Sequence, residues 1–172
     1  AAACLAPEGA TIAINDLDGD TARKTAKEIS TKYSVETMAI TCDVTNETEV
    51  QDMFERLSKH FGRLDILVNN AGIGGEDIGH KVIDMTVDNW NRLIESHMLS
   101  TFLCTRAAIP YMQKNKFGRI INTSSQNYTG GGRSGVSNYS TAKGGVAAFT
   151  RTVAKELGPD GITVNAIAPG YV

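Results

Sequence analysis

The sequence lacks the features that mark membrane-spanning, disulfide-stabilised or metal-binding proteins. No apolar run reaches the roughly 20 residues that a transmembrane helix needs, so we expect no membrane partner. Cysteine occurs only at Cys4, Cys42 and Cys104, in an odd number and without C-x-x-C spacing. We therefore expect reduced core cysteines and a cytoplasmic protein. The three histidines are equally scattered, and no metal site is predicted.

An excess of charge of either sign is also absent. The chain has 17 basic and 19 acidic residues, and no block of basic residues could follow a phosphate backbone. Nucleic acid is therefore not expected as a partner. A length of 172 residues is sufficient for one domain with its own core, and we predict a single domain over 1–172.

Stretches typical of strands and helices alternate along the chain. The predicted strands are 11–15, 35–41, 64–69, 119–123 and 163–167, and the predicted helices are 21–33, 45–61, 87–115 and 138–157. Val50, Phe54 and Leu57 have the spacing of a helix face, with Thr45 as the expected cap, and Pro110 indicates a bend. The order predicts an α/β fold, a doubly wound parallel sheet with helices on both faces.

Ligands of such sheets bind beyond the carboxyl ends of the strands, so the residues that follow each strand are the candidates for function. They are Asp16, Cys42-Asp43-Val44, Asn69-Asn70-Ala71-Gly72, Ser124-Ser125 and Ala168-Pro169-Gly170.

Tyr139 and Lys143 lie four residues apart, which places a phenol and an ammonium on one helix face. A nearby cation favours the phenolate, so Tyr139 could act as an acid or base. The pair alone is weak evidence, because an ordinary pair on a helix surface gives the same pattern. Ser125, at the end of the strand 119–123, could hold a substrate carbonyl beside the tyrosine, whereas the plainer alternative is a serine-rich turn.

Four motifs occur together and in order along the chain. They are Asn69-Asn70-Ala71-Gly72, Ser124-Ser125, Tyr139-x-x-x-Lys143 and the run Val-Asn-Ala-Ile-Ala-Pro-Gly at 164–170. Over essentially its whole length the chain resembles the short-chain dehydrogenase/reductase family, in the branch of 3-oxoacyl-acyl-carrier-protein reductases. The resemblance implies a Rossmann-like fold, an NAD(P)-dependent oxidoreductase acting on a small alcohol or ketone, and a homotetramer.

The resemblance also implies roles for single residues. Tyr139 is similar to the catalytic acid/base, Lys143 to the residue that assists it and binds the nicotinamide ribose, and Ser125 to the serine that orients the substrate. The residues similar to the cofactor-binding set are Asp16, Asp43, Val44, Asn70, Ala71, Gly72, Pro169, Gly170 and Val172, together with Tyr139 and Lys143.

Asp16 favours NAD over NADP. Its position resembles that of the acidic residue that binds both ribose hydroxyls of NAD, and its carboxylate would repel a 2′-phosphate. The alternative is an aspartate that caps the following helix, although Asp18 is better placed for that role. NAD is the predicted cofactor.

His97 departs from the family pattern, in which an asparagine usually occupies this position and serves a proton relay from the lysine. We expect His97 to replace it in the relay, to titrate near neutral pH and to make turnover pH-dependent. The alternative is a buried histidine whose nitrogens are satisfied by neighbours.

The glycine-rich phosphate turn and first strand of the family have no counterpart in these residues. The run Gly130-Gly131-Gly132 lacks the ending of a phosphate loop and is expected to form a rim of the substrate pocket. We expect the chain to be part of a longer protein and to be inactive on its own. A non-catalytic nucleotide-binding scaffold on the same fold, or an epimerase or dehydratase with the same tyrosine and lysine, are the alternative functions.

Overall fold

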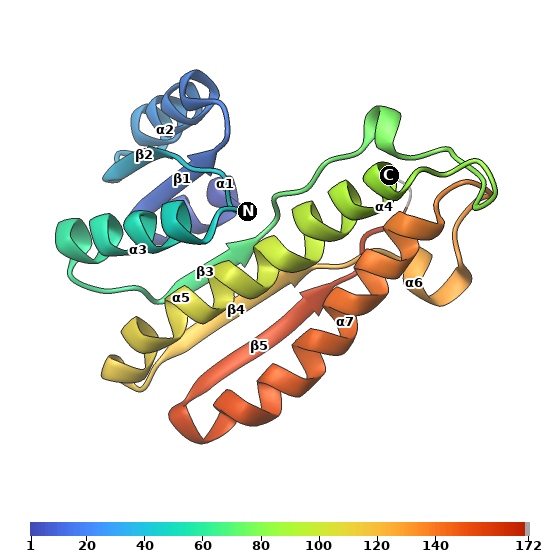
Figure 1. Ribbon diagram of the computed structural model, residues 1–172. Helices are drawn as coiled ribbons and strands as arrows, with labels where there is room; N and C mark the ends of the chain where they lie inside the picture. Colours follow the sequence, from blue (N-terminus) through green and yellow to red (C-terminus); the bar gives the residue numbers. More distant parts are fainter. Residues whose placement is uncertain (171–172) are drawn as a thin grey trace.

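Helices and strands alternate along the computed structural model, which describes residues 1–170 (Figure 1). The strands are β1 (Ile12–Asp16), β2 (Thr37–Thr41), β3 (Ile66–Asn69), β4 (Gly118–Thr123) and β5 (Ile162–Ile167). The helices are α1 (Ala2–Leu5), α2 (Gly19–Tyr33), α3 (Glu47–Phe61), α4 (Val87–Ile94), α5 (Ser100–Asn115), α6 (Asn127–Gly130) and α7 (Ser137–Leu157), with short 3-10 turns at Ala6–Glu8, Gly75–Asp77 and Gly158–Asp160. Each predicted strand is present, and so are the predicted helices 21–33, 45–61 and 138–157, with boundaries shifted by a few residues.

The caps of α2 and α3 come from acidic and amide side chains. The Asp18 carboxylate accepts a hydrogen bond from the Asp20 amide at 2.9 Å, as expected of a helix N-cap. The prediction that Thr45 caps α3 was wrong, since Asn46 occupies the cap and accepts from the Glu49 amide. The Thr45 hydroxyl instead donates to Asp43 at 2.7 Å.

The five strands form two parallel sheets. One has the order β1-β2 and the other the order β3-β4-β5. The α/β class with parallel strands is confirmed, but β1 and β3 are not hydrogen-bonded neighbours, because no strand among residues 1–170 lies between them to pair with both. As an edge strand, β3 is only half-buried, whereas its apolar sequence predicted burial on both faces.

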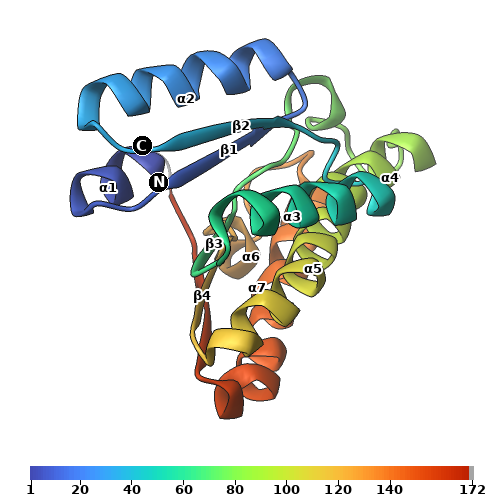
Figure 2. The same cartoon turned by 90° about the vertical axis from the view of Figure 1, so that its left-hand side faces the viewer.

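The helices cover the two sheets differently. Figure 2 shows α2 on one side of the β1-β2 pair and α3 on the other. The three-stranded sheet has α5 and α7 on the same side (Figure 2), so Ile120 and Asn122 are buried while Ile121 and Thr123 on the opposite face are half-buried. Within the residues that the structure describes, the smaller sheet has the expected helices on both faces, and the larger sheet has its two helices on one face (Figure 2).

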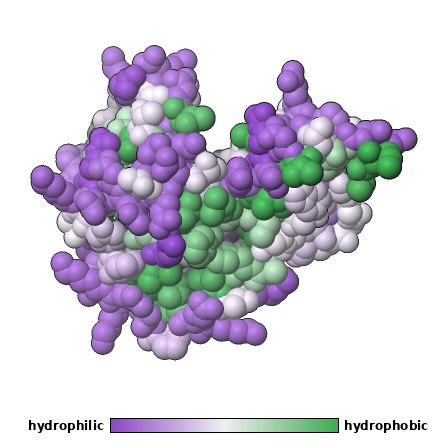
Figure 3. Space-filling model, in the orientation of Figure 1, coloured by the Kyte–Doolittle hydropathy of each residue, from purple (hydrophilic) through white to green (hydrophobic). Residues whose placement is uncertain are grey.

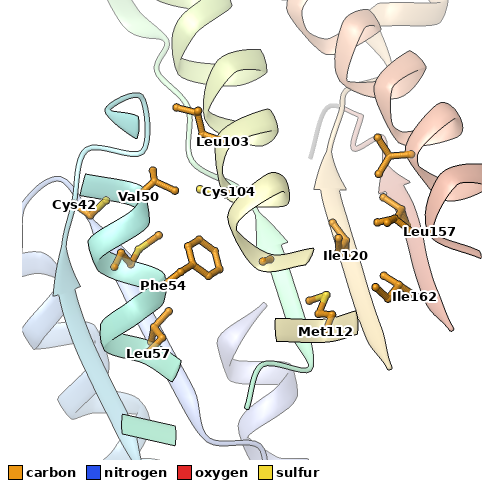
Figure 4. Packing of buried hydrophobic residues seen from close by; sticks show 14 of the residues in the cluster. Cys42, Val50, Phe54, Leu57, Leu103, Cys104, Met112, Ile120, Leu157 and Ile162 are labelled. Carbon is orange, nitrogen blue, oxygen red and sulfur yellow. The ribbon is translucent and has the colours of Figure 1, made fainter. Parts of the chain in front are cut away.

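The main core lies between the sheets and the helices α3, α5 and α7 (Figure 4). Phe54, Met112 and Ile120 are at most 2% exposed and join three of these elements. Cys42 and Cys104 belong to the same core, and burial raises the pKa of the Cys104 thiol to about 12. These two cysteines therefore behave as apolar residues. Cys4, by contrast, is exposed, and its assignment to the core was wrong.

The predicted long helix 87–115 is interrupted, although not at the expected place. Pro110 lies inside α5, and the break in the hydrogen-bond pattern is a π-helical segment, Glu95–Leu99, between α4 and α5. Such segments widen a helix locally and often occur at functional sites. This one contains His97.

Two kinds of feature are absent from the part of the chain that the structure describes. None of its helices combines the length and the apolar character needed to cross a bilayer. Within the same residues, no group of three or more His, Cys, Asp and Glu side chains gathers as a metal site would require.

Candidate active site

A cavity of about 380 Å³ lies beyond the carboxyl ends of β4 and β5. Its wall contains Ser125, which follows β4, Tyr139 from the first turn of α7, and Pro169 and Gly170, which follow β5. The fold therefore brings together residues that are up to 45 positions apart in the sequence. A larger hollow of about 650 Å³ beside α7 and β5 contains neither Ser125 nor Tyr139. The smaller cavity is the candidate site because the groups capable of proton transfer line it.

The two adjacent serines have different roles. The Ser124 hydroxyl donates to the backbone carbonyl of Lys143 at 2.8 Å and ties the end of β4 to α7. The Ser125 hydroxyl accepts from the Asn127 amide at 3.3 Å, which leaves its own proton free to donate. This geometry favours Ser125 as the serine that would meet a substrate.

Lys143 holds a buried positive charge beside the ring of Tyr139. Its side-chain nitrogen lies 5.7 Å from the ring centroid and donates to the carbonyl of Thr123 at 2.7 Å. Lys143 is 4% exposed, and burial lowers the pKa of its ammonium group from 10.5 to about 8. At pH 7 the Lys143 amine is therefore mainly protonated and charged, and in mildly alkaline solution a growing fraction of it becomes neutral.

His97 packs against the same tyrosine. Its ring is 5% exposed and meets the Tyr139 ring edge-on, with centroids 5.4 Å apart. The Nε2 atom lies 2.9 Å from the carbonyl of Ile73, and since a carbonyl can only accept, Nε2 bears the proton. Nδ1 is then an acceptor, and it has no partner within residues 1–170.

The expectation that His97 titrates near neutral pH was wrong. Burial, followed by the charge of Lys143, lowers the pKa of His97 from 6.5 to about 4. The imidazole is therefore neutral under ordinary conditions. Within residues 1–170 the alternative of a fully satisfied histidine is not met either, because only one of the two ring nitrogens has a partner there.

Gly72 is in contact with the imidazole of His97. A Cβ atom on Gly72 would lie 2.0 Å from Cε1 and 2.2 Å from Nδ1 of that ring. Both distances are far too short for atoms that are not bonded to each other. Glycine is needed here because the loop after β3 lies directly against His97.

Asn138 is a buried residue of the site that the sequence patterns did not identify. It is fully buried, and its amide donates to the carbonyls of Asp77 at 2.9 Å and Asn89 at 3.3 Å. Its oxygen accepts from the Tyr139 backbone at 2.8 Å, and Asp77 in turn pairs with Arg92. The available signal was an amide residue immediately before the tyrosine, at the start of a helix.

The candidate cofactor residues lie at the ends of several strands. Asp16 ends β1, and one of its oxygens accepts from the Asp18 amide at 3.0 Å. Asp43 follows the neighbouring strand β2 and binds Thr45, while the amide of Asn15 donates to the Cys42 carbonyl at 3.1 Å and joins the two strand ends.

The remaining candidates are divided between the two sheets. Val44 packs against the main core, and Asn70 accepts from Thr123 at 3.3 Å at the end of β4. Ala71 and Gly72 are exposed in the loop after β3. Val172 lies outside the described residues.

Comparison with known proteins places the chain among reductases and dehydrogenases. A family model described as enoyl-(acyl carrier protein) reductase matches residues 1–172. The chain is 40% identical over 98% of its length to the BbsD subunit of a hydroxy(phenyl)methyl-succinyl-CoA dehydrogenase of Thauera aromatica. It is 38% identical over 99% of its length to a 3-oxoacyl-(acyl-carrier-protein) reductase of Synechocystis sp. (strain ATCC 27184 / PCC 6803 / Kazusa).

A solved structure with a closely similar fold is also found. A crystal structure of NAD+-bound xylitol dehydrogenase matches 99% of the chain with a TM-score of 0.94 and 34% identity. The chain covers 64% of that structure, 65% of the Thauera relative and 68% of the Synechocystis relative, or about two thirds of their lengths.

The low pKa of His97 predicts a pH-dependent stability. In the unfolded chain the imidazole takes up a proton below about pH 6.5, but in the fold only below about pH 4, so acid favours the unfolded state. We expect the free energy of unfolding to fall by up to about 3 kcal/mol more in the wild type than in a His97→Asn variant as the pH drops through this window. Urea denaturation at several pH values measures this difference, and equal losses in both proteins would contradict it.

Proposed function

Because the chain belongs to the short-chain dehydrogenase/reductase family, a family of oxidoreductases, we propose that the intact protein transfers hydride between a nicotinamide cofactor and a carbonyl or secondary alcohol. The observation that supports this most directly is the common cavity of Ser125 and Tyr139, with the Lys143 ammonium 5.7 Å from the tyrosine ring. A bound dinucleotide would supply or accept the hydride. Side chains of the protein would donate or accept the proton.

The proton steps follow from the side chains of the cavity. In reduction, the Tyr139 hydroxyl gives its proton to the substrate oxygen as negative charge develops there, and Ser125 donates a hydrogen bond to the same oxygen. The phenolate that remains is stabilised by the ammonium of Lys143, which the Thr123 carbonyl holds in place. Oxidation of an alcohol uses the same groups in reverse.

His97 is proposed as a neutral member of a proton relay. Its free Nδ1 atom can accept a hydrogen bond from water or from a group on the way to Lys143, which lies close enough to lower the pKa of the imidazole. The asparagine that the family has at this position would offer an amide oxygen for the same purpose. The relay would need no change in the charge of His97 near neutral pH.

The residues at the strand ends are proposed to bind the dinucleotide. One Asp16 oxygen is engaged with the Asp18 amide, and the other is available for ribose hydroxyls. We propose Asp43, Val44, Asn70, Ala71 and Gly72 for the adenosine side. Pro169 and Gly170, in the cavity wall next to Tyr139, together with Val172, would contact the nicotinamide. NAD is preferred because a 2′-phosphate would meet the Asp16 carboxylate.

Self-association is proposed through the helices α4, α5 and α7. Large apolar side chains are exposed on α4, on α5 and on the π-helical segment between them, among them Trp90 at 37%, Leu99 at 37% and Phe102 at 40%. Figure 3 shows apolar surface over the same region. A homotetramer in the cytoplasm, acting on a small-molecule alcohol or ketone, is the assembly that fits the family.

Replacing Tyr139 by phenylalanine distinguishes an enzyme from a scaffold protein that only binds nucleotide. We expect Tyr139→Phe to lower turnover by about 100-fold or more, because the acid/base is lost, while the affinity for NAD changes little. A panel of alcohols and ketones with NAD and NADP, and calorimetry of NAD binding, measure the two properties in the intact protein. The half-buried Tyr111→Phe variant is the control, and wild-type turnover by Tyr139→Phe would refute the proposal.

Replacing Asp16 tests the cofactor preference. We expect Asp16→Ser to shift the ratio of kcat/KM for NAD over NADP toward NADP by at least about tenfold, since the repulsion of the 2′-phosphate is removed. The Asp52→Ser variant removes an equal charge from the exposed face of α3 and should leave the NAD-to-NADP ratio unchanged. The same shift in both variants would show that net charge, and not Asp16, sets the preference.

The relay is tested by pairing two substitutions of His97. We expect His97→Leu, which has no acceptor, to lower kcat by about tenfold or more, and His97→Asn to retain most of it. The pH–rate profile of His97→Asn should keep the shape of the wild-type profile near neutral pH. A His97→Leu variant with the kcat of the wild type would exclude a relay through this residue.

A further inference from the structure

Arg133 places a positive charge in the wall of the candidate active site. It lies on the loop between α6 and α7 and lines the same cavity as Ser125 and Tyr139. Within residues 1–170, it is the only residue with a formal charge among those that line this cavity, and no carboxylate is among them. The buried ammonium of Lys143, behind Tyr139, has the same sign. This distribution of charge favours an anionic ligand over a cationic one.

The guanidinium of Arg133 is free to bind a ligand. No side chain of the described residues forms an ion pair with it. Asp77, next in the chain to the lining residue Ile78, is already paired with Arg92 at 3.2 Å and is buried. An unpaired arginine in a concave wall can bind a carboxylate with two parallel hydrogen bonds.

The loop around Arg133 is anchored on both sides. After it, the Gly135 carbonyl accepts from the Gly79 amide at 2.7 Å, and a Cβ atom on Gly135 would lie 2.7 Å from the Gly79 backbone. Before it, the Gly131 carbonyl accepts from the Ser140 hydroxyl of α7 at 3.1 Å. These contacts hold the backbone of the loop near the start of the helix that contains Tyr139, and the exposed Arg133 side chain extends from this anchored backbone at the cavity wall.

We propose that the substrate is a hydroxy acid or keto acid, whose carboxylate binds Arg133 while its reacting oxygen meets Ser125 and Tyr139. A cavity of about 380 Å³ is at the small end of ligand sites, which favours a compact acid. This substrate class rests on the proposed oxidoreductase function. It makes Arg133 a specificity-determining residue.

Kinetics with matched charged and neutral substrates test the proposal. In the intact protein, β-hydroxy acids of increasing chain length are compared with their uncharged primary amides, using NAD. We expect the acids to have the higher kcat/KM, and Arg133→Gln to lower the ratio of acid to amide roughly 10- to 100-fold, mainly through KM, because a hydrogen-bonded charge pair is lost. The Arg133→Lys variant should have an acid-to-amide ratio of kcat/KM between those of the wild type and Arg133→Gln.

The control is Arg151→Gln, which removes an equal charge from the larger hollow beside α7. We expect this variant to leave the acid-to-amide ratio unchanged. An unchanged ratio in Arg133→Gln, or an equal fall in both variants, would overturn the role of Arg133.

Binding without turnover separates this proposal from the proposed function. Calorimetry in the Tyr139→Phe variant, with NAD present, compares the affinity for the acids before and after the additional change Arg133→Gln. A loss of affinity of roughly tenfold or more supports the anion site even if the wild type oxidises no member of the panel, in which case only the oxidoreductase function fails. Equal affinities in the two proteins would overturn the anion site.

Discussion

The hydrogen bond from the Lys143 ammonium to the Thr123 carbonyl positions most of the candidate site. At 2.7 Å it fastens α7 to the last residue of β4. Ser125 follows two residues after Thr123, and Tyr139 lies one helical turn before Lys143, so this bond sets their relative placement. The return contact from the Ser124 hydroxyl to the Lys143 carbonyl, at 2.8 Å, closes a second link between the same segments. The proposed proton transfer requires both hydrogen bonds, because they keep Ser125 and Tyr139 in the wall of the same cavity.

Burying that charge has consequences for its neighbours. The ammonium of Lys143 loses water, which lowers its pKa to about 8, and it adds to the burial that lowers the pKa of His97 to about 4. The two groups therefore do not compete for a proton near pH 7. One is charged and the other is neutral with a free acceptor, an arrangement suited to passing a proton without building charge.

Much of the fold followed from local patterns, because helix spacing and apolar strands are local properties. Val50, Phe54 and Leu57 are buried as their spacing indicated, and Tyr139 and Lys143 lie together because they are one turn apart. The neutral state of His97 could not be predicted, since it depends on burial by distant segments. The contacts of Asn138 and the position of Arg133 depend in the same way on the loop after β3 packing against the start of α7.

A crystal structure of the intact protein with an oxidised nicotinamide dinucleotide and a β-hydroxy acid tests the central claim most directly. The account predicts the nicotinamide beside Pro169 and Gly170, and the substrate hydroxyl within hydrogen-bond distance of both Ser125 Oγ and Tyr139 Oη, with the ammonium of Lys143 still bound to Thr123. A dinucleotide or substrate seated away from this cavity would contradict it.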